Sequence, residues 1–150
     1  IINKGGCNLS FAGLKTAILR ITKNISTEQE KFDLAASFQK TIEEILYKKT
    51  KVAFQEFKKI NPVSGNNIIV AGGVAANEGI RNKLIKVSNE NSFKAFFPDL
   101  KLCGDNGAMI AMVGLEKYKI KQFDGLDLPA SPRLSLDKSA KFLKGAGVKL

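Results

Sequence analysis

Histidine and tryptophan are absent from the chain, and cysteine occurs only twice among its 150 residues. Without histidine, the chain cannot by itself form a Ser-His-Asp or Cys-His catalytic arrangement, and it cannot form a zinc site built on histidine ligands. Proton transfer near neutral pH would therefore need a carboxylate or a lysine with a shifted pKa, or a group from another chain.

The two cysteines, Cys7 and Cys103, lie far apart and lack the spacing of a metal-binding pair. The simpler interpretation is a reduced, cytoplasmic setting with both thiols buried, although the sequence leaves a disulfide between them open. No apolar run is long enough to cross a bilayer, and no signal-peptide pattern opens the chain, so no membrane partner is expected. The first residue is not methionine, and we therefore expect a fragment or a processed form.

Positive charge is in excess, since 24 Lys and Arg residues face 14 Asp and Glu residues and the formal net charge is +10. A strongly basic chain favours anionic partners such as nucleic acid. The excess is mostly lysine and is spread along the chain without a long cluster. A solvated lysine-rich surface therefore remains an equal alternative to a phosphate-binding face.

A glycine pair lies between a β-branched apolar run and a helical pattern. Residues 68–71 have the composition of a strand buried in a sheet. Gly72 and Gly73 allow a tight turn and leave no side chain to block a flat ligand, and Asn77 can cap the helix that follows. Such a segment can hold a nucleotide against bare backbone, but a turn required only for packing explains it equally well.

A second segment, residues 103–111, combines small residues with a polar pair. Asp105 or Asn106 suits the N-cap of a helix that continues through Leu115, and capping is the simpler explanation of the aspartate. The alternative is that Asp105 is a carboxylate beside a metal or a phosphate at the mouth of a cleft.

Helical and extended patterns alternate along the chain, which favours an α/β fold with at least two parallel strands. Two strands alone make a poor sheet, so we expect the chain to be one lobe of a larger structure. The predicted boundaries separate that lobe, residues 1–121, from an irregular tail, residues 122–150. The expected helices are residues 9–21, 28–60 (with a bend or turn at 48–51), 77–87 and 105–119, and the expected strands are residues 67–71 and 94–97.

Three segments, residues 10–16, 71–77 and 103–111, together resemble in their order the carboxyl-terminal half of the tRNA N6-adenosine threonylcarbamoyltransferase family, formerly known as O-sialoglycoprotein endopeptidase or glycoprotease. The resemblance runs from about Cys7 through Lys119. It implies an actin-like ATPase fold, in which two ribonuclease-H-like lobes surround a nucleotide cleft, with this chain in the carboxyl-terminal part. It also implies transfer of threonylcarbamoyl from threonylcarbamoyl-AMP to N6 of the adenosine adjacent to the tRNA anticodon.

Matched position by position, the resemblance implies roles for four residues. Gly72 and Gly73 would lie under the adenosine, Asn77 would contact the nucleotide, and Asp105 would ligate a divalent metal such as iron. A carboxylate suits such a cation, which would hold and polarise the carbamoyl group as a Lewis acid. The adenine nucleotide would be threonylcarbamoyl-AMP or ATP. We expect Asp105 to face the same gap as the two glycines.

Two positions depart from the family pattern, because Ala12 stands where serine is usual and Gly104 stands where threonine is usual. The family takes its other metal ligands from a His-x-x-x-His motif in the amino-terminal half, which a chain without histidine does not contain. We therefore expect this chain to be inactive alone. Its expected partners are the amino-terminal half of the same protein, tRNA, and other subunits of a threonylcarbamoyladenosine-synthesis complex. Lys15, in the first segment, suits either a structural or a tRNA-facing role.

Two other functions remain open. A non-catalytic nucleotide-binding or scaffold paralogue would also explain the charge and the incomplete site. A glycoprotein endopeptidase, the older description of the family, is disfavoured by the lack of histidine and by the nucleotide-like glycine turn.

Overall fold

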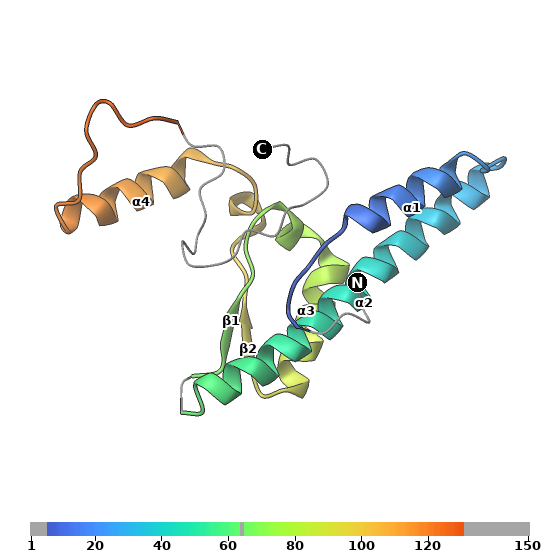
Figure 1. The fold of residues 1–150 in the computed structure, drawn as a ribbon, viewed down its shortest axis with the longest axis horizontal. Coiled ribbons are helices and arrows are strands. Elements are labelled where there is room, and N and C mark those ends of the chain that lie inside the picture. The colour runs from blue at the N-terminus through green and yellow to red at the C-terminus, as the bar shows by residue number, and fades with distance from the viewer. Residues whose placement is uncertain (1–5, 64, 131–150) are drawn as a thin grey trace. The chain divides into compact units, whose positions relative to one another are not determined.

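The computed structural model describes residues 6–63 and 65–130, so most of the predicted tail lies outside the described residues. The chain divides into two compact units between Gly104 and Asp105, and each unit is described by itself. The first unit contains helices α1 (Ala12–Thr22), α2 (Glu28–Ile60) and α3 (Glu78–Glu90), strands β1 (Asn67–Ile69) and β2 (Lys94–Phe96), and the 3-10 helices η1 (Gly73–Ala76) and η2 (Leu100–Leu102) (Figure 1). The second contains α4 (Gly107–Lys119).

Helix α2 has the bounds that the sequence predicts. Its N-cap is Thr27, whose hydroxyl accepts a hydrogen bond from the N–H of Glu30 at 3.2 Å, while the Glu30 carboxylate accepts one from the N–H of Thr27 at 3.1 Å. This reciprocal pair is the capping box, which satisfies two backbone donors at the start of the helix. Asn61 and Pro62 follow its end, because proline disfavours the helical conformation of the residue before it.

The predicted bend in α2 at residues 48–51 is wrong, since the helix is continuous there. Lys49 lies on the packed side of the helix and is only 5% exposed. Its ammonium donates a hydrogen bond to the carbonyl of Gly6 at 2.8 Å. A lysine can bury its methylene stem in this way while its charged end finds an acceptor, so the lysine in the apolar stripe does not require a turn.

Strands β1 and β2 are parallel and are joined through α3, which confirms the predicted α/β class. Ile68 pairs with Ala95 in the register, and the N–H of Val70 donates to the carbonyl of Phe96 at 2.9 Å. Helix α3 begins at its cap Asn77, as predicted, but extends three residues beyond the expected end, to Glu90. A parallel pair needs such a crossover, because the chain must return to the same edge of the sheet.

The core of the first unit lies between α2, α3 and one face of the sheet. The rings of Phe54 on α2 and Phe93, just before β2, are stacked with centroids 3.8 Å apart. The cluster of buried residues comprises Phe54, Ile80, Leu84, Val87 and Phe93. Its members come from segments that are far apart in sequence, so this cluster joins α2 to the β1–α3–β2 unit.

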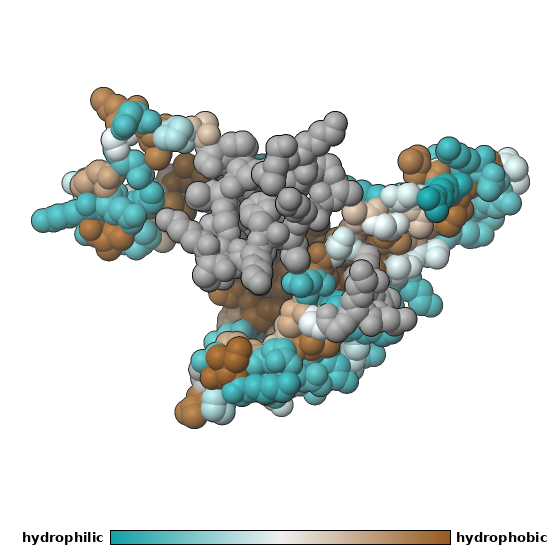
Figure 2. Space-filling model, in the orientation of Figure 1, coloured by the Kyte–Doolittle hydropathy of each residue, from teal (hydrophilic) through white to brown (hydrophobic). Residues whose placement is uncertain are grey.

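The other face of the sheet is uncovered in the described part of the chain. Ile69 is 78% exposed and Phe96 is 41% exposed. They lie with Asn67, Ala71, Phe97 and Pro98 around a shallow apolar groove, and Figure 2 shows hydrophobic surface over the strands. The prediction that residues 68–71 form a strand buried in a sheet is therefore wrong for Ile69 and Ala71, which are exposed, whereas Ile68 and Val70 are half-buried. Successive side chains of a strand alternate between two faces, and helices pack on only one of them.

The two thiols differ in environment. Cys103 is buried, as predicted, whereas Cys7 is exposed, so the prediction that both are buried is wrong. Both are free cysteines, and the structure contains no disulfide between them. The guanidinium of Arg81 donates to the sulfur of Cys103 at 3.3 Å and to the carbonyl of Pro98 at 2.8 Å, which ties α3 to the segment after β2. None of the helices among the described residues has the length and hydropathy needed to cross a membrane.

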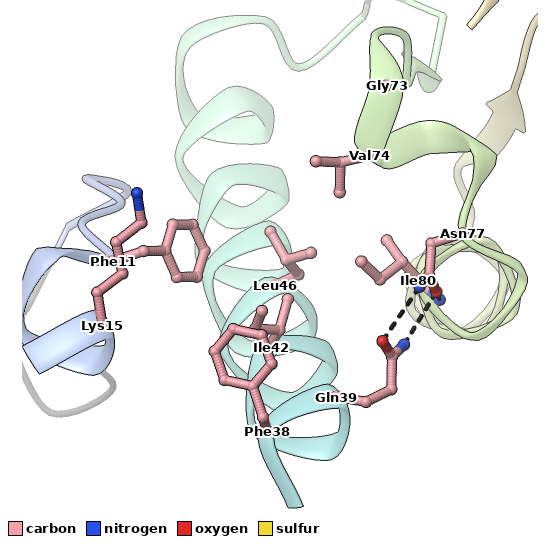
Figure 3. Close-up of a pocket in the computed structure, with 10 residues that line it drawn as sticks. All are labelled: Phe11, Lys15, Phe38, Gln39, Ile42, Leu46, Gly73, Val74, Asn77 and Ile80. Atoms are coloured by element: carbon pink, nitrogen blue, oxygen red, sulfur yellow. Dashed lines mark hydrogen bonds between the residues drawn. The ribbon is translucent and has the colours of Figure 1, made fainter. Parts of the chain in front are cut away.

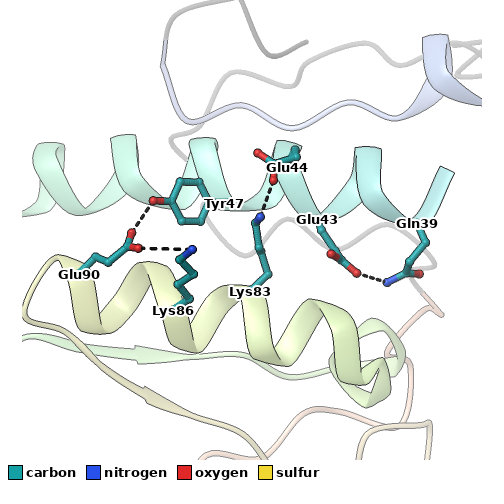
Figure 4. Close-up of polar contacts among 7 residues, drawn as sticks. All are labelled: Gln39, Glu43, Glu44, Tyr47, Lys83, Lys86 and Glu90. Atoms are coloured by element: carbon teal, nitrogen blue, oxygen red, sulfur yellow. Dashed lines mark hydrogen bonds and ion pairs between the residues drawn. The ribbon is translucent and has the colours of Figure 1, made fainter. Parts of the chain in front are cut away.

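A row of polar contacts joins α2 to α3 along the rim of their packed faces (Figure 4). Lys83 forms an ion pair with Glu44, and the hydroxyl of Tyr47 donates to the carboxylate of Glu90. The hydrogen bond from Lys83 lowers the pKa of the Glu44 carboxyl, and the hydrogen bond to Glu90 raises the pKa of the Tyr47 hydroxyl. The rim therefore favours a charged Glu44 and a neutral Tyr47.

We expect the stability of the first unit to depend on pH at both extremes. The Glu44 carboxylate contributes its full stabilisation above the ordinary glutamate pKa, and this is lost as the pH falls through the lowered pKa. The Tyr47 hydroxyl contributes its full stabilisation below the ordinary tyrosine pKa, and this is lost as the pH rises through the raised pKa. In urea unfolding over an acid pH series, the free energy of unfolding should fall less steeply with falling pH for Glu44→Gln than for the parent chain. Glu56→Gln, which removes only an exposed ion pair with Lys59, is the control, and parallel curves for Glu44→Gln and the parent would contradict the assignment.

Candidate functional site

The glycine turn after β1 has the open backbone that the sequence predicts. The backbone of Gly72 has φ +89° and ψ 172°, a conformation that residues other than glycine rarely adopt. Gly73 begins η1, and Asn77 follows its end. Among residues 6–63 and 65–130, no atom would lie within 4 Å of a Cβ atom built on Gly72 or on Gly73. In the described part of the chain, both glycines therefore border space that packed side chains do not fill.

A pocket of about 540 Å³ lies beside this turn (Figure 3). This volume is in the range of roughly 300 to 1,000 Å³ that is typical of small-molecule sites. Its wall brings together the start of α1, the first half of α2, η1 and the first turn of α3. The lining residues are Phe11, Lys15, Phe38, Gln39, Ile42, Leu46, Gly73, Val74, Asn77 and Ile80. The wall is mainly apolar, with a few polar groups, as is usual for a pocket that holds a flat organic ligand.

Asn77 and Gln39 are two of the polar groups of the pocket, and they are bonded to each other. The Nε2 of Gln39 donates to Oδ1 of Asn77 at 2.9 Å, and the Nδ2 of Asn77 donates to Oε1 of Gln39 at 3.1 Å. Oδ1 of Asn77 also accepts the N–H of Ile80 at 3.0 Å, as its capping role requires. The side chain of Asn77 is thus held in one position at the edge of the pocket.

Three of the four predicted site residues lie in the first unit, and two of them, Gly73 and Asn77, line this pocket. Gly72 is their neighbour in the turn. The pocket is also lined by Phe11, Phe38 and Gln39, none of which was predicted as a site residue. Phe38 is one of several apolar residues at helical spacing along α2. Such a stripe usually packs in a core, and no local signal distinguishes the part of it that faces a pocket. Lys15 also lies on the wall, which was not predicted.

Asp105 is the first residue of the second unit. Of the two candidate caps of α4, Asn106 fills the role, since its Oδ1 accepts the N–H of Met109 at 3.0 Å. The carboxylate of Asp105 is exposed and has no hydrogen bond or ion pair among the described residues. It is therefore available to bind a cation, and an oxygen ligand suits a divalent metal.

Asp105 can supply one metal ligand but not a site. No group of three His, Cys, Asp or Glu side chains in residues 6–63 and 65–130 lies in a position to hold a metal. A metal bound by Asp105 would need its other ligands from elsewhere. That Asp105 and the glycine turn face one gap stays a prediction, because they belong to separate units.

The amino-acid sequence is similar to known proteins of one family. The family model for tRNA N6-adenosine threonylcarbamoyltransferase matches residues 1–112. A protein of that name from Pelagibacter ubique (strain HTCC1062) is 68% identical over 150 residues, which are 100% of this chain and 42% of that protein. Others, from Ruegeria sp. (strain TM1040) and Rickettsia rickettsii (strain Sheila Smith), are 43% and 41% identical over 99% and 91% of this chain.

The chain spans about 42% of the length of the relatives from Pelagibacter and Ruegeria. The segment matched by the family model contains all of the predicted site residues, from the glycine turn to Asp105. The resemblance inferred from three short segments is thereby confirmed over most of the chain, and the chain belongs to the tRNA N6-adenosine threonylcarbamoyltransferase family.

Proposed function

We propose that this chain is the nucleotide-binding part of an acyltransferase that moves threonylcarbamoyl from threonylcarbamoyl-AMP to N6 of the adenosine adjacent to the tRNA anticodon. The observation that carries the proposal is the pocket beside the glycine turn, with Asn77 at its edge, in a chain of this family. The relatives are named tRNA N6-adenosine threonylcarbamoyltransferase, and the one from Pelagibacter ubique is 68% identical over the whole of this chain.

The pocket suits the adenosine part of the donor. A purine is flat and largely apolar on its faces, so it can lie on the exposed backbone of Gly72 and Gly73 with aliphatic side chains beside it. Asn77 supplies an amide for a directed hydrogen bond to the nucleoside. ATP, which carries the same adenosine, is the second candidate ligand.

Asp105 is proposed as a ligand of a divalent metal, with iron the first candidate. When bound, such a metal would act as a Lewis acid on the carbamoyl group. Its remaining ligands would come from the part of the protein outside this chain, because the chain contains no histidine and its described acidic residues and cysteines form no metal-binding group.

The uncovered face of the sheet supports the proposal that this chain is part of an actin-like ATPase lobe, in which another segment of the protein completes the sheet. Two strands with exposed Ile69 and Phe96 form too small a sheet to stand alone. The chain covers 42% of its relatives, which leaves more than half of the complete protein to add strands and to cover this face. We therefore propose that the chain alone is inactive. We also propose a cytoplasmic location and further subunits of a threonylcarbamoyladenosine-synthesis complex, and both of these proposals rest only on membership of the family.

The positive charge of the chain is proposed to serve tRNA binding. A formal charge of +10 favours contacts with phosphates, which release counterions and make affinity fall steeply with salt. If the lysines are only a solvated surface and do not contact tRNA, the affinity for tRNA should not fall steeply with salt.

The test uses the complete protein, with incorporation of labelled threonine into tRNA as the measurement and ATP binding by calorimetry beside it. We expect the complete protein to modify tRNA and this chain alone to give no product. Asn77→Ala in the complete protein should weaken ATP binding about tenfold, the effect of one lost hydrogen bond of about 1.4 kcal/mol.

Other outcomes would separate the alternatives. Nucleotide binding by the complete protein without any transfer, under conditions where a relative is active, would favour the non-catalytic paralogue. Unchanged ATP affinity in Asn77→Ala would remove Asn77 from the nucleotide site.

A further inference from the structure

We propose that Gln39 is a positioning residue for the nucleotide, which fixes the side-chain amide of Asn77 so that it presents a hydrogen-bond donor, and not an acceptor, to the ligand. The inference rests on the proposed function, because it assumes that Asn77 contacts the nucleotide. Gln39 lies on α2, 38 residues from Asn77 in sequence, and it meets Asn77 across the edge of the pocket (Figure 3).

The reciprocal bonds between the two amides would by themselves allow either orientation, with both amides reversed together. Two further contacts remove this freedom. At one end, the backbone N–H of Ile80 donates to Asn77, and a donor requires the oxygen of that amide. At the other end, the Nε2 of Gln39 donates to the carboxylate of Glu43 at 2.7 Å, and a carboxylate requires the nitrogen of the amide (Figure 4). Both ends therefore select the same orientation.

The glycine at position 79 makes room for this arrangement. A Cβ atom on Gly79 would lie 2.9 Å from Nε2 of Gln39 and closer still to the carboxylate of Glu43. The ends of both side chains therefore rest against the first turn of α3. A carboxylate is also favoured near a helix amino terminus, where the partial charge of the backbone is positive.

The network decides what Asn77 can offer to a ligand. Oδ1 of Asn77 accepts from Ile80 and from Gln39, which uses both of its lone pairs. One N–H of its amide is donated to Gln39, and no hydrogen bond within the described residues engages the other. That N–H is the group left for the ligand, so Asn77 selects an acceptor atom, such as a ribose hydroxyl oxygen or an adenine ring nitrogen. A group that can only donate would be rejected.

The experiment is a double-mutant cycle in the complete protein, with ATP affinity measured by calorimetry and the melting temperature recorded for every variant. Asn77→Ala is expected to weaken ATP binding about tenfold, and Gln39→Leu, which keeps similar bulk, several-fold. In the Asn77→Ala background, Gln39→Leu should cause no further loss, because its effect is exerted through Asn77. Gln55→Leu, at an exposed position on the same helix, is the matched control and should bind ATP normally.

A second pair of variants tests the hydrogen bond that Gln39 donates to Asn77. Gln39→Glu places two carboxylates side by side and removes the donor to Asn77, so it should weaken ATP binding at least as much as Gln39→Leu. Adding Glu43→Gln provides an amide that can donate to the new carboxylate and removes the repulsion. The double variant should regain a measurable part of the lost affinity. A purely structural role of Gln39 would change the melting temperature without this pattern in ATP affinity.

The outcomes distinguish this inference from the proposed function. If Asn77→Ala binds ATP normally, the assignment of Asn77 to the nucleotide site fails, and the inference fails with it. If Asn77→Ala weakens binding but Gln39→Leu does not, or if Gln39→Leu acts equally in both backgrounds, the inference is overturned and the proposed function stands. If Gln39→Leu does not fold, the Glu pair decides, and equal affinity of Gln39→Glu with and without Glu43→Gln would overturn the inference.

Discussion

Replacing Asp105 with alanine in the complete protein is expected to remove most of its bound divalent metal and, with it, the transfer of threonylcarbamoyl to tRNA. The substitution exchanges an exposed carboxylate for a methyl group and so deletes the proposed oxygen ligand outright. Losing only a hydrogen-bonding partner of a metal ligand costs roughly 10- to 100-fold in affinity or activity, so loss of the ligand itself should exceed that range. Metal content after gel filtration, measured by elemental analysis, is the readout.

The control for Asp105→Ala is Asp99→Ala, another exposed aspartate, which lies in the first unit before η2. We expect it to keep its metal. Asp105→Asn preserves the shape of the side chain and should lose metal as well, since the amide carries no charge. A complete protein that retains its metal in both Asp105 variants would show that this carboxylate is not a ligand, whatever happens to the activity.

Replacing Phe93 with alanine is expected to lower the free energy of unfolding, measured on the complete protein, by about 3 to 5 kcal/mol, the usual cost of deleting a buried phenylalanine ring. Phe93 is buried and belongs to the cluster that joins α2 to the sheet. Its ring stacks on Phe54 and makes an edge contact with Phe57, whose centroid is 5.9 Å away. The total stability of a domain is only about 5 to 15 kcal/mol, so a large share of it depends on this one side chain.

Urea unfolding followed by circular dichroism measures this loss. Phe32→Ala is the matched control, because Phe32 is on α2 but 56% exposed, and surface changes usually stay within about 0.5 kcal/mol. Phe93→Leu should lose less than Phe93→Ala, since it leaves a smaller cavity. Equal unfolding curves for Phe93→Ala and Phe32→Ala would mean that the core does not lie where the structure places it.

The elements of this chain were largely predictable because their signals are local. Thr27 and Glu30 form a capping box within three residues, and Asn61 with Pro62 ends the same helix. The start of α3 at Asn77 follows from the same kind of signal. The predicted bend at residues 48–51 failed because the burial of Lys49 depends on a carbonyl, that of Gly6, more than forty residues away.

The environment of the candidate site was much less predictable. The glycine turn is visible in the sequence, but the pocket beside it is made by α1 and α2, which approach the turn only in the folded chain. Asn77 was assigned as a cap and as a nucleotide contact. That Gln39 and Glu43 fix the direction of its amide could not be predicted, because a hydrogen bond across 38 residues has no periodic or compositional signature.

By itself, the sequence determined the family, the class of fold, the helix caps and the exclusion of histidine-based chemistry within this chain. These properties depend on residue identity or on neighbours within a few positions. Only the tertiary structure decided which face of the sheet is packed, which of two polar residues caps α4, and which atoms of the Asn77 amide are bonded to Gln39. The packed face of the sheet and the bonding of the Asn77 amide depend on side chains that come from distant segments of the chain. The cap of α4 depends on where the backbone enters the helix, since both neighbouring residues are suitable caps. Local spacing in the sequence determines none of these.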